Sequence, residues 1–232
     1  GLITLYDRIV GGVTAISGGG EVPTDAREAF ASLDVLLREA LAGDDGSILG
    51  EAAASGLTAA ELVSNAAVLL FGGIETTEGM IANAVLALLE HPEATARARA
   101  APELVDAAVE ESLRLEPAAA AVDRYATSDV ELDRVRIPAG DLVRVSLNAA
   151  NRDPAVFERP DSYDLARAGA RRHLAFATGP HVCIGVHLAR LEARLALRAI
   201  IERFPGLRLD PEHPSAVTGL VFRKPVSLNV LW

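Results

Sequence analysis

A long, largely apolar stretch between residues 58 and 91 limits the folds open to this chain more than any other part of its sequence. At its start, Thr58 and Glu61 have the spacing of a capping box, in which each side chain accepts a hydrogen bond from the other residue's backbone amide. A helical apolar pattern continues to Leu89, and His91-Pro92 ends it. About thirty residues that are apolar on all sides predict one helix that runs through the core of a mainly helical protein.

The middle of this helix contains Gly72 and Gly73. Glycine in a helix interior costs about 1 kcal/mol relative to alanine, so a compensating interaction is expected here. Gly72, Glu75 and Thr76 stand at positions i, i+3 and i+4 and therefore share one face of the helix. The residues by themselves favour a Glu at the helix surface and a Thr that bonds back to the carbonyl one turn earlier.

Other helices are expected on both sides of the long one. Caps, prolines and glycines set their ends, and Gly43 to Gly46 end the second of them. They run from the start of the chain through Val10, from Pro23 to about Ala42, from Pro92, from Pro102 to Pro117, and from Ile184 to about Phe204.

Short β-like pieces replace the helical pattern between Ala121 and Leu147, at 130–132, 135–137 and 142–145. A small sheet is expected there, followed by irregular coil over 151–165 and a terminal hairpin from Val221 to Leu231. Aromatic residues make up only 4% of a chain rich in alanine, which favours helix over sheet. The expected fold class is mainly α with small β-sheets.

The overall composition excludes several classes of function. The chain has 22 Lys and Arg against 32 Asp and Glu, a net charge of −10, so no nucleic-acid partner is expected. The longest apolar run, 66–74, is about half of the ~18 residues that a membrane helix needs, so we expect no membrane partner and a cytoplasmic protein. The chain opens on Gly1 and enters a helical pattern at once, which predicts one N-terminally truncated domain over residues 1–232.

Cys183 is the only cysteine, which excludes a disulfide within the chain and leaves a buried filler, a nucleophile or a metal ligand. Gly179 and Gly185 flank it and let the backbone approach a bulky group. A helix is expected directly after the sulfur, and its N-terminus favours the thiolate. A zinc site is a further alternative, made of His173, His181, Cys183 and His187.

The segment FATGPHVCIG at 176–185 resembles the cysteine-ligand loop of the cytochrome P450 haem-thiolate monooxygenases, with Ala177 at a position where Gly is commoner. Other segments resemble the same family in the same order along the chain: FGGIETT (71–77), EESLR (110–114), VDRYATSDVEL (122–132), NRDPAVFERPDSYD (151–164) and TGLVFR (218–223). The resemblance implies the C-terminal portion of the P450 fold, of the bacterial soluble type. It would contain the long central I helix, the cysteine-ligand loop and the L helix that follows.

For the haem, the resemblance implies that Cys183 is the axial iron ligand, in a loop that contacts the cofactor through Phe176, Gly179 and Gly185. Two cations match positions that bind the haem propionates. They are Arg124 and His181, whose alternative interpretations are a surface Arg and a loop-capping His.

For the oxygen side of the iron, the resemblance implies that Gly72 and Gly73 leave room for O2 and substrate. Thr76 would then hold a water molecule, and Glu75 would supply protons. Three residues match positions that line the substrate pocket, although by themselves they are ordinary core residues: Ala120, Leu220 and Val221.

Glu111 and Arg114 stand at i and i+3, and in the family such a pair is a buried structural ion pair. A third Arg normally completes that network. Where the family has it, this chain offers Ser162, with Arg159 and Arg167 as alternatives nearby. A basic stripe of Arg190, Arg194 and Arg198 is expected to be a solvated helix face, or else a docking site for an acidic ferredoxin.

Together these features predict a monooxygenase that inserts one oxygen atom from O2 into a small apolar organic substrate. The implied cofactor is haem b, with electrons from NAD(P)H through ferredoxin reductase and ferredoxin. A truncated, non-catalytic homologue that acts as a structural or interaction partner is the main alternative. A haem enzyme that uses peroxide is less favoured, because the pairing of Glu75 with Thr76 suits proton delivery.

Overall fold

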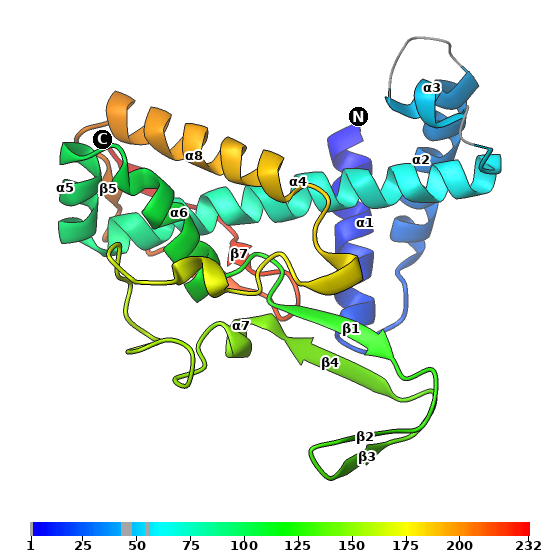
Figure 1. The fold of residues 1–232 in the computed structure, drawn as a ribbon. Helices are drawn as coiled ribbons and strands as arrows, with labels where there is room; N and C mark the ends of the chain where they lie inside the picture. The colour runs from blue at the N-terminus through cyan, green and yellow to red at the C-terminus, as the bar shows by residue number, and fades with distance from the viewer. Residues whose placement is uncertain (1, 43–47, 54–55) are drawn as a thin grey trace. The chain divides into compact units, whose positions relative to one another are not determined.

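The computed structural model describes residues 2–42, 48–53 and 56–232. Contacts divide the chain into two compact units, Gly1–Thr76 and Thr77–Trp232, and the boundary falls within the helix α4 (Ala59–Glu90). Figure 1 shows the order of the elements along the chain. Helices dominate and the sheets have two strands each, so the predicted fold class is confirmed.

The first unit contains α1 (Leu2–Ser17), α2 (Thr24–Ala42), the short α3 (Ile48–Ala53) and the beginning of α4. The limits predicted for the second helix are confirmed, whereas α3 was not predicted and Gly43 to Gly46 lie outside the described residues. Gly12 lets α1 approach α2 closely, because a Cβ atom there would lie 2.7 Å from the Cβ of Ala26. Buried side chains of α2 and α4 form a core: Leu33, Leu37, Val63 and Ala66.

The capping box at the start of α4 is present as predicted. The Thr58 amide donates to Glu61 Oε2 at 2.8 Å, and the Glu61 amide donates to Thr58 Oγ1 at 3.3 Å. The helix is 32 residues long and ends before His91-Pro92. The prediction that α4 is buried on all sides is wrong for its first half, where Val68 is 69% exposed in the described chain. In its second half, most residues from Met80 to Leu88 are buried.

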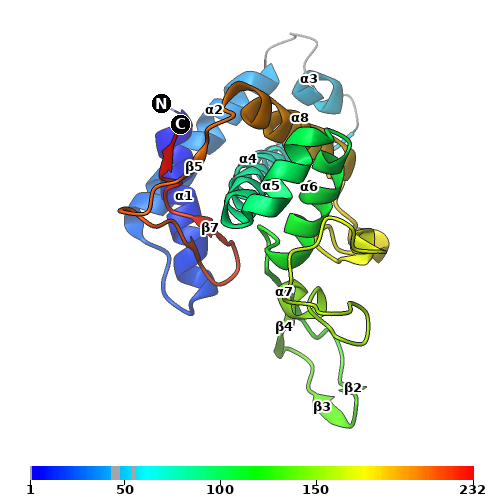
Figure 2. The same ribbon diagram turned by 90° about the vertical axis from the view of Figure 1, so that its left-hand side faces the viewer.

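Three helices of the second unit pack around the end of α4: α5 (Pro92–Ala100), α6 (Leu104–Leu115) and α8 (Val186–Arg203). The unit also contains the short α7 (Leu147–Ala150). Figure 1 and Figure 2 both show α6 and α8 side by side. Their shared core contains Val85, Leu88, Ala98, Val109 and Leu197.

The apolar residues that predicted α8 do not form its buried face. Ile184 precedes the helix, and Leu188 and Leu195 are exposed, whereas Ala189 and Ala193 are buried. Ala189, Ala193 and Leu197 form the buried side of α8, which packs on α6. The predicted helix from Ile184 to about Phe204 is confirmed, with its start two residues later.

Antiparallel strands follow α6 as expected. β1 (Ala121–Tyr125) pairs with β4 (Leu142–Ser146), and β2 (Val130–Leu132) pairs with β3 (Val135–Ile137). The loop between β2 and β3 has only two residues, Asp133 at φ 47° and Arg134 at φ 69°, as a type I′ hairpin turn requires. The range of β1 was not predicted.

The predicted hairpin from Val221 to Leu231 is wrong. β7 (Lys224–Pro225) pairs with the preceding β6 (Val217–Thr218), and β8 (Val230–Leu231) pairs with β5 (Arg208–Leu209). The tight turn lies earlier, at Gly219, which has φ 104° and where a Cβ atom would lie 2.0 Å from the carbonyl oxygen of Phe222. The turn between β6 and β7 spans residues 219–223, so β7 pairs with β6, and β8 pairs with the more distant β5.

Candidate functional site

The loop before α8 holds Cys183 in a defined backbone conformation. The Cys183 amide donates to the carbonyl oxygen of Phe176 at 3.0 Å, and the Ala177 amide donates to that of Leu174 at 2.8 Å. Between them, Ala177 at φ 58° and Gly179 at φ 74° are both left-handed. The loop therefore folds back on itself and presents Cys183, whose side chain is exposed, before α8 begins at Val186.

The surroundings of the sulfur are open and apolar. Val182 and Ile184, which flank it in sequence, are 52% and 89% exposed. At Gly185, the N-cap of α8, a Cβ atom would meet only Cys183 Sγ within 4 Å, at 3.9 Å. An exposed thiol with exposed apolar neighbours and no side chain at Gly185 fits a large, flat, apolar group that binds through the sulfur.

The predicted oxygen-side residues lie in α4 and belong to the first unit. Cβ atoms at Gly72 and Gly73 would have no other described atom within 4 Å, apart from the neighbouring helix backbone, so packing does not account for these glycines. Glu75 is only 5% exposed, so its interpretation as a surface residue is wrong. The Thr76 hydroxyl donates to the Gly72 carbonyl at 2.5 Å, the bond to the preceding turn that the sequence favoured.

The two cations proposed for the propionates both lie in the second unit and are exposed. Arg124 is on β1, and its NH1 group donates to the carbonyl oxygen of Asp123 at 2.8 Å. His181 ends the 3-10 turn Gly179–His181, two residues before Cys183. Exposure leaves both side chains accessible to an anionic group.

The predicted substrate-pocket residues come together only in part. The Ala120 amide donates to the carbonyl oxygen of Val221 at 2.8 Å, so these two positions are neighbours. Ala120 is buried, whereas Leu220 is 59% exposed.

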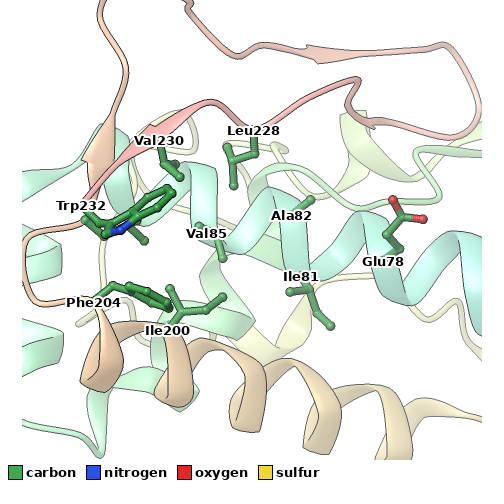
Figure 3. A pocket seen from close by; sticks show the side chains of 10 residues that line it. Glu78, Ile81, Ala82, Val85, Ile200, Phe204, Leu228, Val230 and Trp232 are labelled. Atoms are coloured by element: carbon green, nitrogen blue, oxygen red, sulfur yellow. The ribbon is translucent and has the colours of Figure 1, made fainter.

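An apolar pocket of about 440 Å³ lies elsewhere in the second unit, between α4, α8 and the C-terminal strands (Figure 3). The rings of Phe204 and Trp232 approach edge to face across it, with centroids 6.3 Å apart. Its lining includes none of the residues predicted for the substrate, the haem or oxygen.

The Glu111–Arg114 pair is completely buried and has a third partner. Arg114 donates to both carboxylate oxygens of Glu111 at 2.9 Å, and Arg167 Nε donates to Oε1 at 2.8 Å. Arg159 instead lies 3.8 Å from Asp164 and is largely exposed. Arg167 is thus the third member of the Glu111–Arg114 network. The Ser162 hydroxyl accepts a hydrogen bond from Arg167 at 3.1 Å.

A second buried carboxylate, Glu110, was missed by the sequence reasoning. Arg190 donates to it through Nε at 2.7 Å and NH2 at 3.0 Å, and His173 Nε2 lies 3.1 Å from Oε2. Burial raises the pKa of Glu110, but the hydrogen bonds from His173 and Arg190 outweigh it and bring the pKa below its usual value. The adjacent pair of glutamates in EESLR was the available signal.

The basic stripe on α8 is not a solvated face. Arg190 pairs with Glu110, Arg194 lies 3.4 Å from Asp106, and Arg198 NH2 donates to the carbonyl oxygen of Pro102 at 3.4 Å. All three partners belong to α6 or to the segment just before it. The stripe therefore joins two helices, and α6 carboxylates neutralise two of its three charges.

The zinc alternative fails on geometry. Within the described ranges, no group of three or more His, Cys, Asp and Glu side chains is arranged to hold a metal ion. Both ring nitrogens of His173 are already engaged, by Glu110 and by the Ala175 amide. Among the described residues, none of the helices has the length and apolar character needed to cross a membrane.

Comparisons with known proteins give one consistent result. A family model described as cytochrome P450 matches residues 33–228. Nocardicin C N-oxygenase from Nocardia uniformis subsp. tsuyamanensis is 48% identical over 180 residues, which are 76% of this chain and 45% of that protein. Cytochrome P450 monooxygenase PikC from Streptomyces venezuelae is 45% identical over 199 residues, which are 81% of this chain and 48% of that protein.

The solved structures point the same way. Cytochrome P450 CREJ in complex with (4-ethylphenyl) dihydrogen phosphate matches with a TM-score of 0.89 and 31% identity, over 100% of this chain and 60% of that one. The chain spans about half the length of the curated relatives it matches.

Proposed function

The chain belongs to the cytochrome P450 family, and on that premise we propose that the protein is a haem-thiolate monooxygenase. It inserts one oxygen atom from O2 into a small apolar organic substrate. The observation that carries this proposal is the Cys183 loop, closed by the bond from the Cys183 amide to Phe176 and open at the sulfur.

The proposed cofactor is haem b, held by Cys183 as the axial ligand. When bound, the haem supplies an iron centre at which a thiolate ligand favours cleavage of the O–O bond. Gly179 and Gly185 would let the loop approach the cofactor, and Phe176 is the third residue of the loop proposed to contact it. Arg124 and His181 supply the positive charges for the propionates.

On the oxygen side, Gly72 and Gly73 leave space beside α4 for O2 and substrate. The Thr76 hydroxyl donates its proton to the Gly72 carbonyl, so its oxygen is oriented to accept a hydrogen bond from a water molecule. Glu75, one position earlier, is the proposed source of protons. Ala120, Val221 and Leu220 are proposed to line the substrate site.

The proposed electron donors are ferredoxin and ferredoxin reductase, with NAD(P)H as the ultimate source, which suits a cytoplasmic protein. Docking of an acidic ferredoxin on the α8 stripe is not supported, since Arg190 and Arg194 already pair with carboxylates of α6.

The test is the absorption spectrum of the purified chain after addition of haem, reduction and exposure to carbon monoxide. We expect a red-shifted Soret band for the wild type and its loss in Cys183→Ser. Val226→Ser, at a side chain that is 89% exposed and lies outside the cysteine loop, is the control and should keep the band. An unchanged band in Cys183→Ser would overturn the ligand assignment.

A further inference from the structure

Glu110 and its partners form a second buried polar cluster, separate from the one around Glu111. Glu110 is 5% exposed, and the fork of Arg190 on α8 binds both of its carboxylate oxygens. Arg171 Nε lies 3.6 Å from Oε1 but its side chain is 71% exposed. A bidentate Arg–carboxylate pair of this kind forms strong charge-assisted hydrogen bonds, and it fixes the orientation of the guanidinium as well as its distance from the carboxylate.

His173 completes the cluster as a neutral side chain. The Ala175 amide donates to its Nδ1 at 3.2 Å, so that nitrogen carries no proton. Nε2 is then the protonated nitrogen and donates to Glu110 at 3.1 Å. Arg190 is therefore the principal buried counter-charge of Glu110, and loss of its fork leaves a carboxylate with too few partners.

The same Arg190 guanidinium reaches the cysteine loop. Its central carbon lies 4.9 Å from the centroid of the Phe176 ring, a cation–π distance, and the His173 ring lies 6.1 Å from the same centroid. The carbonyl oxygen of Phe176 accepts a hydrogen bond from the Cys183 amide. A short series of contacts thus leads from α6 through Arg190 and Phe176 to the backbone of Cys183.

We propose that Arg190 is a positioning residue for Cys183: the Glu110 carboxylate orients its guanidinium, which holds the Phe176 ring and with it the backbone that fixes the Cys183 amide. The use of the sulfur as a haem ligand rests on the proposed function. The effect of Arg190 on the Cys183 backbone, through the Phe176 ring, does not depend on it. Arg190 itself touches neither the sulfur nor any reacting atom.

Arg194 provides a matched control one turn along α8. It pairs with Asp106, one turn earlier on α6, but through a single contact of 3.4 Å between side chains that are 40% and 42% exposed. An exposed pair of this kind contributes little to stability. The variants Arg190→Gln and Arg194→Gln therefore each remove a guanidinium of α8 that pairs with a carboxylate of α6. Arg190 also lies over the Phe176 ring.

The first measurement is hydrogen exchange of the Cys183 amide in the chain without haem. We expect exchange about tenfold faster in Arg190→Gln, the effect of losing hydrogen bonds to a buried charge, and a rate within about twofold of wild type in Arg194→Gln. Phe176→Leu removes the ring but keeps the Glu110–Arg190 pair, so it should also accelerate exchange, even if Arg190→Gln unfolds. Wild-type exchange in a folded Arg190→Gln or in Phe176→Leu would overturn the proposal.

The second measurement is the spectrum of the reduced, carbon monoxide-bound protein. Arg190→Gln should give a smaller share of the red-shifted band than Arg194→Gln, with Arg190→Lys intermediate because lysine keeps the charge but lacks the planar fork. If the red-shifted band had the same relative intensity in Arg190→Gln and Arg194→Gln, the proposed effect of Arg190 on the Cys183 sulfur would be refuted. If the wild type itself shows no red-shifted band, the proposed function fails, and the exchange rates still decide on the coupling.

Discussion

Replacing Ala177 by glycine should stabilise the protein, which is unusual for an alanine-to-glycine change. Ala177 has φ 58° in the cysteine loop, and the left-handed conformation costs an L-residue about 1–2 kcal/mol. Glycine avoids that cost, but it destabilises the folded state by about 0.4–1 kcal/mol because it increases the conformational entropy of the unfolded chain. Ala177 is half-buried, so loss of its methyl group removes a further fraction of ~0.8 kcal/mol. The net gain is about 0.5 kcal/mol.

The assay compares two identical substitutions with opposite expected signs. Ala199 is exposed within α8, where glycine should cost about 1 kcal/mol. The two variants should therefore differ by about 1.5 kcal/mol, or roughly 3–6 °C in thermal midpoint for a chain of this size. Calorimetry on Ala177→Gly and Ala199→Gly measures that gap. Equal losses in both variants would show that the left-handed backbone at Ala177 is not under strain.

The remaining predictions concern the two buried carboxylates and the turn near the C-terminus. Arg167→Met should cost about 3–5 kcal/mol in urea unfolding, because it leaves Glu111 underpaired, whereas Arg159→Met at an exposed pair should cost at most about 1 kcal/mol; similar costs would contradict the assignment of Arg167. Glu110 has a lowered pKa in the folded protein, so its contribution to stability is complete above the ordinary Glu value of about 4.3 and is lost as the pH falls through the lower folded value. Thermal midpoints between pH 3 and 6 should thus fall less steeply in Glu110→Gln than in wild type, and parallel curves would argue against this role. Gly219→Ala should destabilise by about 1–3 kcal/mol, measured by denaturant titration, since φ 104° and the Phe222 carbonyl both exclude a side chain; a neutral effect would refute the turn geometry.

Local signals in the sequence predicted the helices well, because each rests on neighbouring residues. The capping box at Thr58 and the proline at 92 mark real helix ends. The terminal hairpin was wrong and the buried face of α8 was not predicted, because both depend on distant partners. Ala189 is buried in a core that residues of α4, α5 and α6 also form, and β8 pairs with β5 some twenty residues earlier in the chain. No local periodicity reveals either arrangement.

The candidate site was predictable where a motif is contiguous and not where a side chain reaches across the fold. The Cys183 loop is one short segment, so its residues could be anticipated, whereas the left-handed backbone at Ala177 was not predicted. The third arginine required knowing that the chain after Ser162 brings Arg167, rather than Arg159, onto Glu111. The Glu110–Arg190 pair spans eighty residues, and its members looked like an ordinary helix-surface pattern in sequence.

The two adjacent carboxylates of α6 have a consequence for how this helix tolerates changes in length. Successive residues of a helix point about 100° apart, so Glu111 meets the coil while Glu110 meets α8 and the cysteine loop. Inserting or deleting a single residue earlier in α6 would turn both carboxylates away from their arginines at once. Homologous chains should therefore vary in length in the β2–β3 hairpin and its flanking loops long before they do so between Leu104 and Glu110.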